Sequence, residues 1–127
     1  MKKLITTLTL LLMFSSPSYA EWTKVSEGVE SGNTFYVDFD RIRKVDGFVY
    51  YWVLSNLLKP DSDGDFSYKS YRQGDCKLFR LKGLSVSAYT QQMGKGTPSV
   101  SSNKPQEWKY PSPNSVNELI LNKVCKR

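Results

Sequence analysis

Two groups of aspartates have spacings that catalytic or metal-binding carboxylates can have. Asp38 and Asp40 lie two residues apart, and on a strand they would share one face, as a carboxylate pair requires. Their place before a turn favours a simpler role, in which Asp40 bonds to nearby backbone groups. Asp61, Asp63 and Asp65 alternate around a glycine, but this glycine precedes the third acid, and the next seven residues contain no acid. An EF-hand loop has its glycine after the third acid, so we interpret this group as a polar hairpin loop.

A basic stretch with interleaved aromatic rings is the third candidate site. Cations can attract acidic ligands, and aromatic rings between them can stack against flat groups. A solvated strand face is the simpler interpretation, and a basic sheet face for an acidic host or cell-wall ligand is the functional one. The candidate ligand-binding face comprises Lys69, Tyr71, Arg72, Lys77, Arg80 and Lys82.

The two cysteines, Cys76 and Cys125, predict a disulfide if the chain is exported, because an even pair in an oxidising compartment is normally bonded. The bond would close a 49-residue loop and contribute about 4 kcal/mol in the loop-entropy model. A zinc site needs four ligands of the Cys and His type, and the chain has no His. A redox pair would normally be separated by two residues.

The composition argues against an enzyme. Without His, a nucleophile–His arrangement cannot form. No glycine-rich phosphate-binding motif is present, and no tuned pair of titratable groups for general acid–base catalysis is visible. We therefore expect a non-enzymatic protein with no cofactor and no metal.

The first twenty residues have the organisation of a secretory signal peptide. Lys2 and Lys3 precede an apolar run, and small residues up to Ala20 provide a cleavage site. The run is shorter than the roughly 20 apolar residues that cross a bilayer, and no cysteine near the cleavage point indicates a lipid anchor. We expect a mature domain of residues 21–127, without a stable membrane anchor, that is periplasmic, secreted or at the cell surface.

The net charge is +6 for the whole chain and +4 without Lys2 and Lys3. This mild excess can serve solubility or favour acidic partners such as glycans and anionic lipid. Because the chain is expected to be exported, we predict a protein or other macromolecule outside the cytoplasm as partner, and no nucleic acid.

The sequence of the mature region predicts several strands followed by one helix. β-Branched and aromatic residues, punctuated by turn signals such as Asp46-Gly47, predict strands over residues 22–26, 34–39, 48–54, 66–72 and 76–89. The apolar positions change parity after Leu81, which predicts a one-residue bulge near Lys82-Gly83. Residues 91–106 are rich in Gly, Ser and Pro and predict an extended loop.

A helix is expected at the end of the chain. Pro113 suits its first turn, Ser115 and Glu118 have capping-box spacing, and Cys125 closes it. The predicted fold is α+β, with a curved antiparallel sheet of about five or six strands and this C-terminal helix packed on it. The predicted core consists of Val37, Tyr50, Trp52, Leu54, Phe79, Leu81, Leu84, Val86, Leu119 and Ile120.

The mature chain resembles the surface-adhesin protein E family from about Trp22 to Cys125. The likeness is carried by 35-Phe-Tyr-Val-Asp-38, 49-Val-Tyr-Tyr-Trp-52 and 71-Tyr-Arg-Gln-Gly-Asp-Cys-76, with Phe79-Arg80 and the final cysteine. Its sharpest element is Gly74-Asp75-Cys76 with a partner cysteine in a closing helix. The resemblance implies an antiparallel sheet with a helix packed on it, and a disulfide between Cys76 and Cys125.

The resemblance also implies a binding function. A surface lipoprotein of this family binds host matrix proteins such as vitronectin and laminin, whereas this sequence lacks a lipidation cysteine. Two functions therefore stay open. One is an exported binding protein that contacts host matrix or envelope macromolecules through its sheet or through residues 91–106. The other is a soluble periplasmic inhibitor or accessory factor of a secreted or envelope protein.

Overall fold

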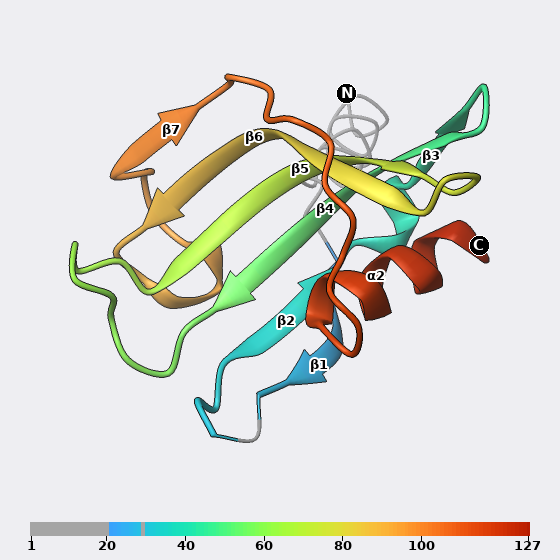
Figure 1. The fold of residues 1–127 in the computed structure, drawn as a ribbon. Coiled ribbons are helices and arrows are strands. Elements are labelled where there is room, and N and C mark those ends of the chain that lie inside the picture. The colour runs from blue at the N-terminus through green and yellow to red at the C-terminus, as the bar shows by residue number, and fades with distance from the viewer. Residues whose placement is uncertain (1–20, 29) are drawn as a thin grey trace, which may run out of the picture.

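Seven strands and one α-helix make up the fold in the computed structural model, which describes residues 21–28 and 30–127 (Figure 1). The strands form one antiparallel sheet in the order β1-β2-β4-β5-β6-β7, with β3 paired to β4. This confirms the predicted α+β fold, while the predicted signal peptide lies outside the described residues. The strands are β1 (Thr23–Glu27), β2 (Thr34–Val37), β3 (Arg43–Val45), β4 (Phe48–Asn56), β5 (Ser67–Asp75), β6 (Arg80–Tyr89) and β7 (Val100–Ser102), and the helix is α2 (Val116–Cys125).

Strand β4 organises the sheet. Its β-branched and aromatic residues pair with β5 over nine positions, from Phe48 opposite Asp75 to Asn56 opposite Ser67. The chain enters β4 through the predicted Asp46-Gly47 turn, where both residues have positive φ, 52° and 85°. Such angles suit Asp-Gly in a two-residue hairpin loop, so local sequence sets the register here.

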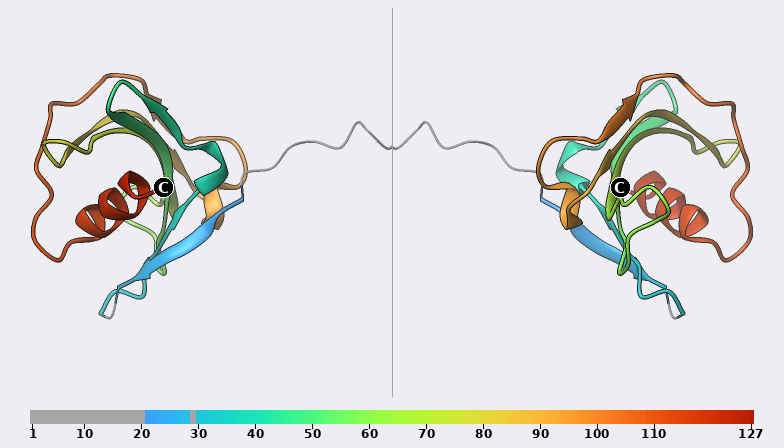
Figure 2. Two further views of the ribbon diagram at one scale, coloured as in Figure 1. Left: turned by 90° about the vertical axis from the view of Figure 1, so that its right-hand side faces the viewer. Right: turned by 90° about the vertical axis from the view of Figure 1, so that its left-hand side faces the viewer.

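The core lies between α2 and one face of the sheet, which we call the helix face (Figure 2). Strand β4 contributes Val49, Tyr51 and Val53 to it, and α2 contributes Ile120 and Leu121; each is at most 1% exposed. Burial of these side chains is the main source of stability. The complete buried cluster is Val37, Val49, Tyr51, Val53, Leu81, Ile120, Leu121 and Val124.

The predicted core was correct only in part. Val37, Leu54, Leu81 and Ile120 are buried as expected. Tyr50 and Trp52 were placed wrongly because β4 is apolar on both faces and α2 covers the side that carries Val49, Tyr51 and Val53. Tyr50 and Trp52 lie half-buried on the opposite face, Leu84 and Val86 are half-buried, Phe79 packs at the margin of the core, and Leu119 is 39% exposed.

The predicted bulge is present in β6, at Leu84. Tyr71 of β5 pairs with Ser85 and Arg72 with Gly83, so one residue of β6 is left without a partner. The extra residue keeps Leu81 and Val86 on the helix face, as the change of apolar parity predicted.

Several strand bounds differ from the prediction: β2 ends at Val37, β4 continues to Asn56, and β5 continues to Asp75 through residues predicted to lie outside the strand. Strand β6 begins at Arg80 because residues 76–79 form the turn after β5. The expected loop 91–106 contains β7, whose exposed Val-Ser-Ser has no apolar alternation and joins the sheet through pairing with β6. Short β3 was also missed, since its three residues are exposed and two of them are charged.

The final helix begins at Val116 rather than near Pro113. Asn114 has a φ of 63°, which helical backbone cannot accommodate, so residues 112–115 form a turn instead. The Ser115 hydroxyl accepts the Glu118 backbone N–H at 3.2 Å, as the capping-box spacing predicted. Glu118 in return accepts the N–H of Asn114, at 3.0 Å.

A disulfide joins Cys76, just after β5, to Cys125, the last residue of α2, as predicted. It fastens the C-terminal end of the helix to the turn between β5 and β6. Beside it Leu121 packs directly over Gly74, where an added Cβ would lie 2.7 Å from the Leu121 Cδ1. Glycine at this position therefore permits close approach of helix and sheet. Within the described part of the chain, no helix has the length and apolar character to cross a bilayer.

Candidate binding face

The side of the sheet opposite α2 carries a band of aromatic and basic side chains, which we call the open face. In the described part of the chain no α-helix covers it (Figure 2). Strand register places its members together, since residues directly opposite each other on neighbouring strands share a face. The open face comprises Arg43, Phe48, Tyr50, Trp52, Lys69, Tyr71, Arg80, Lys82, Tyr89 and Trp108.

Aromatic rings form two packed groups on this face. The Tyr71 ring lies between those of Trp52 and Tyr50, with centroid separations of 4.8 and 6.3 Å. Farther along, Phe48 stacks on Trp108 at 5.9 Å. All five rings are half-buried, so each presents part of its surface to solvent. Rings held by their neighbours lose little conformational freedom when a partner covers them, which favours binding.

Cations lie over several of these rings. Arg80 and Lys82 both lie over Trp108, with the charged group 4.5 and 4.8 Å from the ring centroid. Lys69 lies 5.0 Å from the centroid of Tyr89, and Arg43 lies 5.8 Å from that of Tyr50. These cation–π contacts hold the positive groups above the sheet, where they can meet acidic or aromatic groups of a partner.

The structure separates the six residues predicted as a ligand-binding face. Lys69, Tyr71, Arg80 and Lys82 lie together on the open face. Arg72 is on the helix face, opposite Tyr51, and donates a hydrogen bond to Asn117 of α2 at 2.8 Å. Lys77 is exposed in the turn between β5 and β6. Strand alternation places Arg72 opposite in direction to Tyr71, so the six residues do not form one surface.

Of the rings on this face, only Tyr71 was among the predicted binding residues. Tyr50 and Trp52 were expected in the core, although they alternate along the strand with Val49 and Tyr51 and therefore lie on the other side. The sequence around Trp108 did not indicate that this ring lies on the open face. The ring reaches the face because Lys109 pairs with Leu81 through two backbone hydrogen bonds of 2.9 Å.

Both aspartate groups serve local structure. The buried Asp38 carboxylate, rather than Asp40, caps the turn: it accepts the Asp40 N–H at 3.2 Å and the Arg41 Nε–H at 2.8 Å. Asp40 is exposed beside Glu21; a hydrogen bond to Asp40 and charge repulsion raise the pKa of Glu21.

The Asp61, Asp63 and Asp65 group lies in the loop between β4 and β5, where its carboxylate oxygens come within 4.8 Å of one another. Asp61 accepts the backbone N–H groups of Asp63 and Asp65 at 3.0 and 2.9 Å. Its other oxygen accepts the Tyr68 hydroxyl, and Asp65 accepts the Ser99 hydroxyl at 2.7 Å. These bonds build the polar loop that the sequence predicted.

Asp75 holds one of the open-face cations in place. Its carboxylate accepts the backbone N–H groups of Lys77 and Leu78, both at 3.1 Å, and the Nε–H of Arg80 at 3.0 Å. These bonds favour the ionised form, so the Leu78 N–H above all, with Arg80 and the Lys77 N–H, lowers the pKa of Asp75. Asp75 thus organises the turn and orients Arg80 over Trp108.

Replacing Asp75 with Asn should make stability less dependent on pH. A carboxylate with a lowered pKa stabilises the fold above the usual Asp pKa of about 4 and loses that contribution as pH falls through the folded value. Thermal melts from pH 7 to pH 2.5 should therefore show a gap between wild type and Asp75→Asn that closes in acid. A gap that stays constant over this pH range would contradict the assignment.

Comparison with known proteins identifies the family. Residues 22–126 match the family described as surface-adhesin protein E. The chain belongs to this family. Membership makes it a surface-adhesin-like protein and implies export or location at the cell surface, with partners among extracellular macromolecules. Comparison with curated protein sequences yields no match.

Solved structures of Haemophilus influenzae protein E share the adhesin E fold seen here. Crystal form II has 16% sequence identity and a TM-score of 0.64, and the match covers 87% of this chain and 91% of that one. The selenomethionine form has 15% identity and a TM-score of 0.62, over 87% and 89% of the two chains. Protein E from non-typeable Haemophilus influenzae has 14% identity and a TM-score of 0.57, over 89% and 82%. At these identities the likeness concerns the fold.

Proposed function

We propose that this protein is an exported, non-enzymatic binding protein whose open face contacts a host matrix or envelope macromolecule. The observation that carries the proposal is the group of packed rings formed by Trp52, Tyr71 and Tyr50, which has cations nearby and is left uncovered by the helix. Trp, Tyr and Arg are the residue types that contribute most to protein interfaces. Membership of the surface-adhesin protein E family supports a partner outside the cytoplasm.

Location decides between the two functions that the sequence left open. Antibody labelling and protease treatment of intact cells, repeated after opening the outer membrane, will show where the native protein is exposed. Signal on intact cells supports a surface adhesin. Signal only after opening overturns the adhesin proposal and supports a periplasmic inhibitor or accessory factor.

Tyr71→Ala should weaken binding to immobilised vitronectin or laminin, the matrix proteins expected from the family resemblance. Tyr71 contacts the rings on both sides of it, so truncation removes a contact surface and loosens Trp52 and Tyr50. A residue central to an interface contributes about 2 kcal/mol or more, which corresponds to roughly 30-fold in affinity. Surface plasmon resonance with the purified protein measures this change.

Tyr110→Ala is the matched control, because Tyr110 is 68% exposed and takes part in none of the ring contacts of the open face. The affinity of the Tyr110→Ala variant for vitronectin or laminin should equal that of wild type. Equal loss in both variants, or none in Tyr71→Ala while wild type binds, would show that the open face is not the contact surface.

A further inference from the structure

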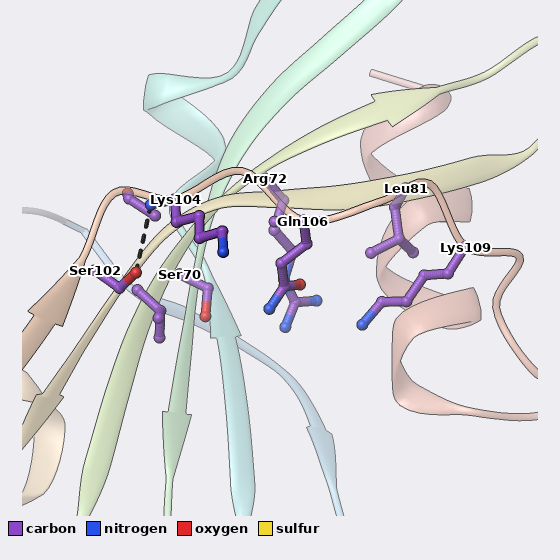
Figure 3. A pocket seen from close by; sticks show the side chains of 10 residues that line it. Ser70, Arg72, Leu81, Ser102, Lys104, Gln106 and Lys109 are labelled. Carbon is purple, nitrogen blue, oxygen red and sulfur yellow. Dashed lines mark hydrogen bonds between the residues drawn. The ribbon is translucent and has the colours of Figure 1, made fainter.

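A second polar site lies on the helix face, beside α2 and away from the open face. It is a cavity of about 220 Å³ between β5, β6 and the segment that follows β7 (Figure 3). A water molecule takes up about 30 Å³, so the cavity can hold a small ion together with water. We call it the basic cavity, and its polar lining includes Ser70, Arg72, Ser102, Lys104, Gln106 and Lys109.

All charged side chains that line the basic cavity are positive. Lys104 and Lys109 extend toward one another from its two ends, with Arg72 and Gln106 between them (Figure 3). The lining contains neither Asp nor Glu. Among the described residues, the ion pairs use Lys24, Arg41 and Arg80, so none of the three cavity cations is neutralised by a carboxylate.

Arg72 is held in position by the core. Its guanidinium donates to the Asn117 side chain at 2.8 Å and lies beside the phenol of Tyr51, and burial lowers the pKa of Arg72 while raising that of Tyr51. The Tyr51 hydroxyl is fully buried, and no described residue offers it a hydrogen bond of normal geometry. Arg72 is partly buried, and among the described residues it has no carboxylate partner, so this corner of the fold would gain from a bound anion.

We propose that the basic cavity binds a tetrahedral oxyanion, a sulfate or phosphate group, with Arg72, Lys104 and Lys109 as its charged ligands. Three cations without a carboxylate suit a group that carries up to two negative charges, and Arg forms paired bonds to such oxygens. Hydroxyls of Ser70 and Ser102 and the amide of Gln106 can donate to oxygens that the cations leave free. The site uses none of the open-face residues and so extends the protein beyond its proposed function.

The test is titration of the purified protein with sodium sulfate and sodium phosphate at low millimolar concentration, with chloride keeping ionic strength constant. Amide ¹H–¹⁵N spectra should show saturable shifts at Gly83 and Gln106, which line the cavity and share a backbone hydrogen bond of 2.9 Å. The variant Lys104→Gln/Lys109→Gln should weaken binding by about tenfold or more. Both lysines are exposed, so this variant should fold normally.

Lys123→Gln/Lys126→Gln removes the same charge from exposed positions near the end of α2 and should bind like wild type. This control matters because sulfate and phosphate also stabilise proteins by exclusion from the surface. Equal behaviour of all three proteins, or shifts that avoid Gly83 and Gln106, would overturn the proposal. Tyr71→Ala should keep anion binding, so loss of the open-face function would not be confused with loss of this site.

A second pair of titrations identifies the source of the anion. Glucosamine 6-sulfate and glucosamine 1-phosphate carry the two groups on the same sugar. Tighter binding of the sulfate would indicate a sulfated glycan, and tighter binding of the phosphate would indicate a phosphorylated envelope glycan. Failure of both sugars to bind, while the inorganic anions bind, would support a site for free sulfate or phosphate.

Discussion

Reduction of the Cys76–Cys125 disulfide will lower the free energy of unfolding by about 4 kcal/mol. The bond spans 49 residues, and loop-closure entropy of the unfolded chain over that length accounts for a change of this size. For a domain of about this size the melting temperature should fall by at least about 15 °C. Calorimetry with and without reductant measures the difference.

Cys76→Ser/Cys125→Ser is the control for reduction. The double variant should melt like the reduced wild type and should not respond to reductant. Because the bond holds the end of α2 against the β5–β6 turn, hydrogen exchange should rise first in the last turn of the helix. An unchanged melting temperature on reduction would contradict the stabilising role of the disulfide.

Leu121→Ala will destabilise the protein by about 2–5 kcal/mol, the usual cost of truncating a fully buried leucine. The cost should lie toward the upper end, since Leu121 packs over Gly74, and a glycine has no side chain that could move into the space left behind. Denaturant unfolding monitored by circular dichroism measures the change. Leu119→Ala is the matched control on the same helix, and with 39% of its surface exposed it should cost no more than about 1 kcal/mol.

The Gly74 contact can be tested in the same series. Gly74→Ala alone brings a methyl group within 2.7 Å of Leu121 and 2.8 Å of Val49, and it should be destabilising. In the Leu121→Ala background the first clash disappears, so the penalty should shrink, and a double-mutant cycle reports the coupling. Equal costs for Leu119→Ala and Leu121→Ala would show that the helix is rotated relative to the packing described here.

Many of the strands and turns could be predicted from local sequence alone. Asp46-Gly47 predicted the β3–β4 turn because few residues adopt two successive positive φ angles. The run 48–54 predicted the central strand, and the parity change after Leu81 predicted the bulge, because side chains alternate strictly along a strand. The Ser115 cap could also be predicted from the sequence, because it depends on residues only three apart.

The candidate site was less predictable because it depends on which face the helix covers. The alternation of side chains along β4 divides its apolar residues between the two faces of the sheet. It does not determine whether Tyr51 or Trp52 faces α2. Strand β7 depends on a pairing partner 14 residues away, with Ser87 opposite Ser101. Neither the covered face of β4 nor β7 has a signal within a short window of sequence.

The sequence by itself determined the α+β class, most of the strands, the cysteine pair and the resemblance to its family, because each rests on residue type and short-range spacing. Only the tertiary structure decided that Tyr50 and Trp52 join Lys69 and Tyr71 on an open face, while Arg72 turns to the opposite side. It also brought Lys104 and Lys109 to Arg72. The physical reason is that packing α2 on one face buries apolar area on one side only, and this choice assigns every strand residue to the core or to solvent.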